Sequence, residues 1–75
     1  MQRYRNLSGN SGVAAFEVGD DSITVEFRTG DRYLYTDASA GRENIRRMHQ
    51  LARRGAGLAS FINRCVRERY ARRLH

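Results

Sequence analysis

Hydrophobic and polar residues alternate through the first half of the chain. Between residues 13 and 36, apolar side chains recur at every second position in three short runs: Ala14, Phe16 and Val18; Ile23, Val25 and Phe27; Tyr33 and Tyr35. Alternation with a period of two is typical of strands that bury one face, so the pattern predicts three antiparallel strands. A symmetric turn over residues 19–22 pairs Phe16 with Val25 on the buried face. It pairs Ala14 with Phe27 on the same face.

The turn between the second and third runs allows two registers. They place Tyr33 on opposite faces of the sheet, because neighbouring side chains point to opposite sides. A two-residue loop pairs Tyr33 with Glu26 and turns the polar positions of the third strand toward the core. A three-residue loop over residues 28–30, with Gly30 left-handed in a bulge, turns Tyr33 and Tyr35 inward instead. We favour this register because it buries two aromatic rings. Its pairs are Tyr33 with Val25, Tyr35 with Ile23, and Arg32 with Glu26 on the solvent face.

Beyond the third strand, apolar residues recur at the three- and four-residue spacing of amphipathic helices. One helix is predicted from Asp37 or Ser39, either of which can cap its first turn, to about Arg54. Gly55 ends this helix, because glycine just past a helix readily adopts the left-handed conformation. A second helix is predicted over residues 58–72. The apolar stripes are Ile45, Met48, Leu51 and Ala52 on the first helix, and Leu58, Phe61, Ile62, Cys65, Val66 and Tyr70 on the second.

These elements predict an α+β fold in which a three-stranded antiparallel β-meander is followed by two helices packed on its one apolar face, in the order βββαα. Residues 1–12 are rich in Ser, Asn, Gly and Arg and predict a flexible N-terminal tail. Residues 13–75 then form a single domain with a thin core, as expected for a chain of this length.

Positive charge is concentrated in the second half of the chain. The 75 residues include 14 arginines and no lysine, and the formal net charge is +6. Residues 42–75 hold ten of the arginines and only two acids. A guanidinium group stays ionised and grips phosphate through two parallel hydrogen bonds. The asymmetry therefore predicts a polyanionic partner.

Cysteine and histidine are too scarce for the disulfides or metal sites that often stabilise small domains. Cys65 is the single cysteine, so an intramolecular disulfide is excluded, and His49 and His75 are too few to hold a structural zinc ion. No run of residues has the length and apolarity of a signal peptide or a membrane span. We therefore expect no metal, no cofactor and no membrane partner, and a cytoplasmic location.

The order and spacing of several residues resemble the KTSC domain over residues 11–71. The matching positions are Ile23, Val25, Phe27, Thr29, Gly30, Tyr33, Tyr35, Phe61, Ile62, Asn63, Val66, Arg67 and Tyr70. KTSC domains occur at the C-terminus of some lysyl-tRNA synthetases and as free-standing small bacterial proteins, an association that implies RNA binding. Many members carry a Ser-Lys-Gly-like turn between the helices. This chain has Arg-Arg-Gly-Ala-Gly at residues 53–57, so no role of that lysine is carried over.

Arginines on the two expected helices form the main candidate site. On the first helix Arg42, Arg46, His49 and Arg53 recur at helical spacing, in one stripe away from the apolar positions. Arginines near the C-terminal end of a helix interact favourably with the helix dipole, by about 0.3–1 kcal/mol each, but this accounts for only a few of these arginines. The simpler alternative is that arginine merely solvates the helix surfaces; we favour phosphate binding. The candidate nucleic-acid contacts are Arg42, Arg46, Arg53, Arg54, Arg64, Arg67 and Tyr70.

The aromatic pair at Tyr33 and Tyr35 has two interpretations. Tyrosines on a sheet stack on unpaired bases when they are exposed, but the favoured register turns both rings inward, so we assign this pair to the core. Tyr70, which lies among arginines, is the better candidate for an aromatic contact beside phosphates. Cys65 is expected to be a small buried hydrophobe and His49 a neutral, solvent-facing ring.

Two positions near the expected second helix remain open. Asn63 either bonds to nearby backbone or contacts a ligand. Gly55 and Gly57 either form a plain turn between the helices, which we favour, or hold an anion at the start of the second helix.

The acids lie mostly on turns and exposed strand positions, so catalytic triads and paired carboxylates lack partners, and we expect no enzyme. The sequence thus predicts a small basic binding module that binds nucleic acid, RNA above all, through an Arg-rich helical face. The alternative is an adaptor that docks on the acidic surface of another protein. The oligomeric state is left open.

Overall fold

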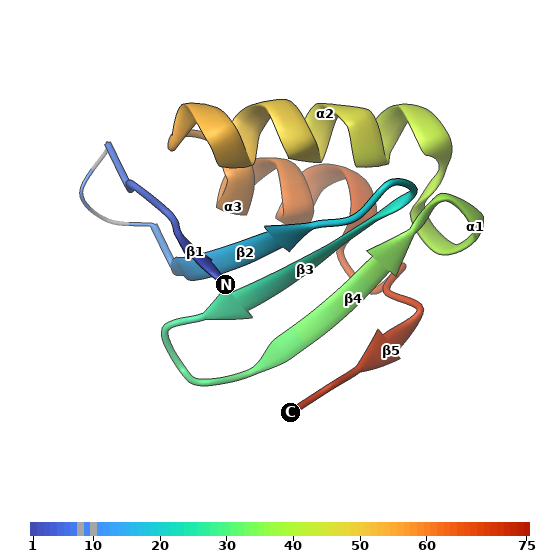
Figure 1. Ribbon diagram of the computed structural model, residues 1–75, viewed down its shortest axis with the longest axis horizontal. Helices are drawn as coiled ribbons and strands as arrows, with labels where there is room; N and C mark the ends of the chain where they lie inside the picture. The colour runs from blue at the N-terminus through green and yellow to red at the C-terminus, as the bar shows by residue number, and fades with distance from the viewer. Residues whose placement is uncertain (8, 10) are drawn as a thin grey trace.

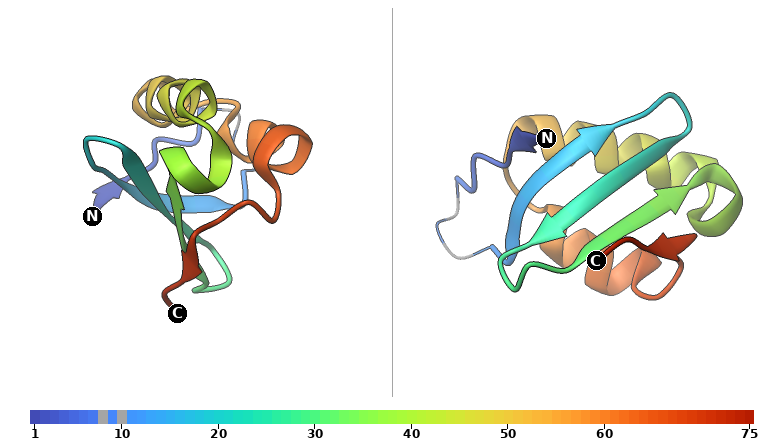
Figure 2. Two further views of the ribbon diagram at one scale, coloured as in Figure 1. Left: turned by 90° about the vertical axis from the view of Figure 1, so that its right-hand side faces the viewer. Right: turned by 60° about the horizontal axis from the view of Figure 1, so that its bottom comes forward.

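The computed structural model describes residues 1–7, 9 and 11–75, and it confirms an α+β fold built on an antiparallel sheet (Figure 1). The sheet contains five strands in the order β1-β2-β3-β4-β5, rather than the three expected: β1 Gln2–Arg3, β2 Val13–Val18, β3 Ser22–Phe27, β4 Arg32–Thr36 and β5 Arg72–Arg73. The helical layer contains α1 Asp37–Ala40, α2 Arg42–Arg54, α3 Leu58–Phe61 and a π-helical turn, η1, Ile62–Val66. Figure 2 shows that α2 and α3 lie on the same face of the sheet.

The core lies between these two layers, because the strands and helices each turn one apolar side toward the other layer. Ile23 and Val25 from β3 and Tyr35 from β4 are almost completely buried. The buried residues as a set are Tyr4, Val13, Phe16, Ile23, Val25, Tyr35, Ala40, Ile45, Met48, Leu51, Ala52, Leu58, Ile62 and Val66. The apolar stripe predicted for the first helix is therefore confirmed.

The favoured register of the second hairpin is confirmed. Tyr33 pairs with Val25, and the Nε of Arg32 lies 2.8 Å from a carboxylate oxygen of Glu26. Gly30 has the left-handed backbone that the three-residue loop requires, with φ +96°. Tyr35 consequently points into the core.

The first hairpin departs from the symmetric turn near its open end. Phe16 pairs with Val25 as expected, but Phe27 pairs with Val13, not Ala14, because the register shifts between Val13 and Ala15. Such an irregularity moves every side chain beyond it by one position. Val13, only 1% exposed, takes the core place expected for Ala14.

The N-terminal segment differs from the expected tail, because Gln2–Arg3 pairs with β2 and Tyr4 enters the core with 3% of its surface exposed. The backbone N–H of Tyr4 also donates to Ala14, at 3.0 Å. A two-residue strand has no alternation to detect, which is why the pattern of the sequence did not reveal it. Ser8 and Asn10 of the expected tail lie outside the described residues.

The first predicted helix is divided in two at Gly41, whose φ of +97° interrupts the helical backbone. The residue that caps α1 is Thr36, neither Asp37 nor Ser39. Thr36 and Ser39 form a capping box, in which each side chain bonds to the backbone N–H of the other residue. Gly55 ends α2 as predicted, in the left-handed conformation with its N–H donating to Leu51.

The second predicted helix is much shorter than residues 58–72, because the π-helical turn ends it at Arg67, which has a positive φ of +20°. A π turn holds more residues than an α turn, so residues four apart stay on one side. Leu58, Ile62 and Val66 are buried accordingly, and Cys65 is exposed, contrary to expectation. Arg72 and Arg73, expected at the helix end, form the edge strand β5 against β4.

Candidate nucleic-acid interface

Every arginine of this chain is exposed to solvent, because a buried guanidinium group would need a carboxylate partner to offset its desolvation. Among the residues that the structure describes, the ion pairs are Arg32 with Glu26 and Arg73 with Asp31, each at 2.8 Å. Within this part of the chain, the other arginines lack a carboxylate within salt-bridge distance. Most of the positive charge is thus available to a partner.

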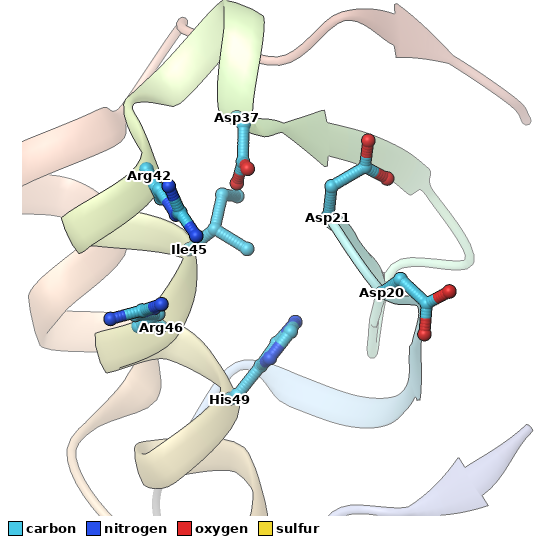
Figure 3. A pocket seen from close by; sticks show the side chains of 7 residues that line it. All are labelled: Asp20, Asp21, Asp37, Arg42, Ile45, Arg46 and His49. Carbon is cyan, nitrogen blue, oxygen red and sulfur yellow. The ribbon is translucent and has the colours of Figure 1, made fainter.

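The stripe predicted along the first helix does not form a uniformly positive surface. Arg42 and Arg46 line a pocket of about 440 Å³ together with Asp20 and Asp21 of the β2–β3 turn and Asp37 of α1 (Figure 3). Carboxylates this near weaken the attraction of the two arginines for an anion.

His49 occupies the same pocket but is not the solvent-facing ring that the sequence predicted. It is half-buried, and its Nε2 lies 2.7 Å from the backbone oxygen of Ser22 at the start of β3. This hydrogen bond joins α2 to the sheet.

A second pocket, of about 380 Å³, brings together three arginines that the sequence did not single out. We call it the basic pocket; it is lined by Arg3, Tyr4, Arg5, Asn6, Val13, Ala14 and Arg28. Pairing of β1 with β2 brings Arg3 to this edge of the sheet. The backbone N–H of Arg28 donates to Gly12 at 2.8 Å and holds the β3–β4 turn beside the same edge. Among the described residues, no carboxylate lines this pocket.

Backbone contacts hold the basic pocket next to the end of α2. The guanidinium of Arg5 donates to the carbonyl oxygen of Arg53, and the N–H of Leu7 donates to Gly55 at 2.7 Å. The N-terminal segment therefore lies against the C-terminal end of α2. This end also carries Arg54, so five arginines from three parts of the chain share one region: Arg3, Arg5, Arg28, Arg53 and Arg54.

The turn between the helices serves packing, as favoured from the sequence. The N–H of Leu58, at the start of α3, donates to the Tyr4 hydroxyl at 3.3 Å. An added Cβ on Gly55 would lie 2.7 Å from the Cβ of Arg5, so the N-terminal segment packs directly against this turn.

A third pocket, of about 210 Å³, lies between the core-facing side of β4 and η1. We call it the aromatic pocket; it is lined by Phe27, Tyr33, Tyr35, Ile62, Asn63, Arg67, Glu68 and Tyr70. The ring centroids of Tyr33 and Tyr70 are 4.6 Å apart. Phe27 meets Tyr33, and Tyr35 meets Tyr70, edge to face. The guanidinium carbon of Arg73 lies 5.8 Å from the centroid of the Tyr33 ring.

Tyr35, at 1% exposed, is the most buried residue that lines the aromatic pocket. Burial first, and then the phenols of Tyr33 and Tyr70, together raise the pKa of Tyr35 to about 12. The three hydroxyls therefore lie near one another. Among the described residues the Tyr35 hydroxyl makes no hydrogen bond, and no buried side-chain nitrogen or oxygen lacks one, so this hydroxyl keeps contact with solvent at the pocket.

The predicted contact residues thus fall into separate regions. Arg53, whose carbonyl oxygen accepts from Arg5, and its neighbour Arg54 lie at the end of α2 next to the basic pocket. Arg67 and Tyr70 line the aromatic pocket, and Arg42 and Arg46 share a pocket with acids. Arg64 is exposed on η1, and its Nε lies 3.5 Å from the Ser60 carbonyl oxygen. Asn63 is exposed at the aromatic pocket.

Sequence reasoning missed Arg3, Arg5 and Arg28. The position of Tyr4 between Arg3 and Arg5, typical of a buried ring flanked by exposed charges, was an available signal for those two residues, but no local pattern marks Arg28.

Comparison of the chain with protein-family models, with curated proteins and with solved structures finds no match. Among the described residues, no helix is long and apolar enough to cross a bilayer.

Proposed function

We propose that this protein binds single-stranded RNA through the arginines of the basic pocket and the adjoining end of α2. One observation carries the proposal: Arg3, Arg5 and Arg28 surround a single cavity that, among the described residues, has no carboxylate in its lining. Guanidinium groups bind phosphate oxygens in a bidentate way, and several around one hollow suit a chain of phosphates.

The proposal shifts the interface away from the helical stripe expected from the sequence. Arg53 and Arg54 stay in it because Arg5 bonds to the backbone of Arg53 at this end of α2. Arg42 and Arg46 contribute less because Asp20, Asp21 and Asp37 lie around the same pocket. Such contacts position a strand without reading its sequence.

We also propose that the chain is a KTSC-like, non-catalytic domain that acts in the cytoplasm, where its RNA partner would be met. The support for this is that several residues that match the KTSC pattern come from distant parts of the sequence and line one pocket. They are Phe27, Tyr33, Tyr35, Ile62, Asn63, Arg67 and Tyr70.

The test is a titration of fluorescently labelled single-stranded RNA at salt concentrations between 50 and 200 mM. Each phosphate contact to a single strand contributes about −0.7 to the slope of log K against log salt, so four to six contacts predict a slope of about −3 to −4. Arg28→Gln should flatten the slope by about 0.7, and Arg47→Gln, an exposed arginine on α2, serves as the charge-matched control.

A slope near zero would overturn the proposal. Retention of one acidic protein from a cell extract, without RNA binding, would favour the adaptor function instead, since its affinity would depend on a few anchors and not on many phosphates.

A further inference from the structure

We propose that the aromatic pocket holds one unpaired nucleobase of the bound strand. This inference rests on the proposed function and adds to it a second type of contact, to a base instead of to phosphates. It follows from the walls of the pocket, its polar groups, its size and its place beside the basic pocket.

The walls of the pocket are aromatic and partly open to solvent. The Tyr70 ring is tilted by 44° against Tyr33, and its residue is 36% exposed. Tyr35 and Phe27 support these two rings from the side, both in edge-to-face contacts. Rings that are held in place in this way offer a face on which a base can stack, whatever its identity.

The polar groups of the pocket suit a heterocycle better than an anion. Asn63 and Arg67 bring hydrogen-bond donors, and Asn63 and Glu68 bring acceptors. A nucleobase edge carries both kinds of group, whereas a free phosphate would be repelled by the Glu68 carboxylate.

The Tyr35 hydroxyl is available to a ligand. It makes no hydrogen bond among the described residues, and it is open to solvent, since no buried polar side-chain atom there is unpaired. A phenol hydroxyl both donates and accepts, so it can bond to either kind of group on a base edge.

Size and position agree with this occupant. A volume of about 210 Å³ is below the 300–1,000 Å³ or so of sites for drug-sized ligands, so the pocket fits one flat ring system and not a large cofactor. Phe27 lines the aromatic pocket, and the next residue, Arg28, lines the basic pocket. Both pockets therefore lie at the same end of β3, within reach of one strand.

The experiment compares two single-stranded RNA probes of equal length, one with all its bases and one with abasic sites throughout. The wild-type protein should bind the base-bearing probe about 5- to 150-fold more tightly, as expected for one stacked base. Tyr70→Ala should remove most of this preference and leave affinity for the abasic probe within twofold of the wild-type value. Tyr70→Phe keeps the ring and should keep most of the preference.

Two additions keep the test decisive. Leu74→Ala removes an exposed side chain of the same C-terminal segment and should change neither affinity. Asn63→Ala, at an exposed position, should lower the affinity for the base-bearing probe alone, even if Tyr70→Ala fails to fold as judged by circular dichroism.

Equal affinity of the wild-type protein for both probes would overturn the base-pocket inference and leave phosphate binding intact. A base preference that survives in both Tyr70→Ala and Asn63→Ala would overturn it as well. Binding of neither probe at low salt would overturn the proposed function itself.

Discussion

The phenol of Tyr35 is a titratable probe of folding. Burial and, to a smaller extent, the phenols of Tyr33 and Tyr70 raise its pKa from an ordinary value of 10.0 to about 12. In the unfolded chain the pKa returns to about 10, so above pH 10 the unfolded state loses a proton that the folded state keeps. The free energy of unfolding therefore falls as the pH rises from 10 to 12, by about 2–3 kcal/mol in total.

This fall is measurable by urea denaturation at pH 9, 10 and 11. From pH 9 to pH 11 the wild-type protein should lose about 1 kcal/mol more than Tyr35→Phe, because that variant lacks the ionising group. At pH 9 the two proteins should differ by less than about 1 kcal/mol, since the hydroxyl has no hydrogen-bond partner among the described residues. Parallel pH profiles for the two proteins would contradict this account of Tyr35.

Glycines with the same backbone conformation differ in what surrounds them. Gly55 and Gly30 both have a positive φ, of +83° and +96°. An added Cβ would meet the Cβ of Arg5 at 2.7 Å on Gly55, but would meet no atom within 4 Å on Gly30. Substitutions at Gly30 would therefore report the cost of backbone strain alone. Substitutions at Gly55 would report that cost and, in addition, the packing of the N-terminal segment against the end of α2.

We expect Gly55→Ala to destabilise the protein more than Gly30→Ala. Both variants carry the backbone cost of about 1–2 kcal/mol for a left-handed residue with a side chain. Gly55→Ala adds a steric cost of about 1–3 kcal/mol. Urea denaturation of the two variants measures the difference, and equal losses would show that the N-terminal segment does not pack where the structure places it.

At the scale of elements, the sequence predicted most reliably those segments whose pattern repeats. β2, β3 and β4 have regular alternation, and burying two tyrosines decided the register between β3 and β4. The apolar stripe of α2 repeats over three turns and is likewise found as predicted.

The ends of the chain were not predictable in this way. β1 and β5 have two residues each, too few to show a period, and they form because β2 and β4 have edges open to pairing. The π turn of η1 also has no sequence signal of its own, so the burial of Val66 was predicted correctly and that of Cys65 was not.

In the candidate site, too, the sequence predicted some residues and missed others. The sequence identified Arg67, Tyr70 and the tyrosine pair of β4, which converge on one pocket. It missed the basic pocket, because that pocket depends on β1 placing Arg3 beside a turn that is 25 residues away in the chain. Contacts between segments that far apart leave no local pattern.

Across the whole molecule, the acids that surround Arg42 and Arg46 lie far from the basic pocket. Asp20, Asp21 and Asp37 lie at the end where α2 begins, whereas the basic pocket lies beside the end where α2 finishes (Figure 1). For the proposed RNA partner, this arrangement would favour approach to the basic pocket over approach to the β2–β3 turn. The division of charge in the sequence, between residues 1–41 and 42–75, does not describe it, because Arg3, Arg5 and Arg28 come from the first part.

Two double variants that remove the same charge test this polarity. Arg3→Gln with Arg28→Gln should flatten the salt slope of RNA binding by about 1.4, which is two contacts at about 0.7 each. Arg42→Gln with Arg46→Gln should flatten it by less than about 0.5, because the surrounding aspartates already oppose phosphate contacts there. All four side chains are exposed, so neither pair should change the melting temperature by more than a few degrees. Equal slopes for the two double variants would mean that RNA responds to net charge alone and that the basic pocket has no special role in binding.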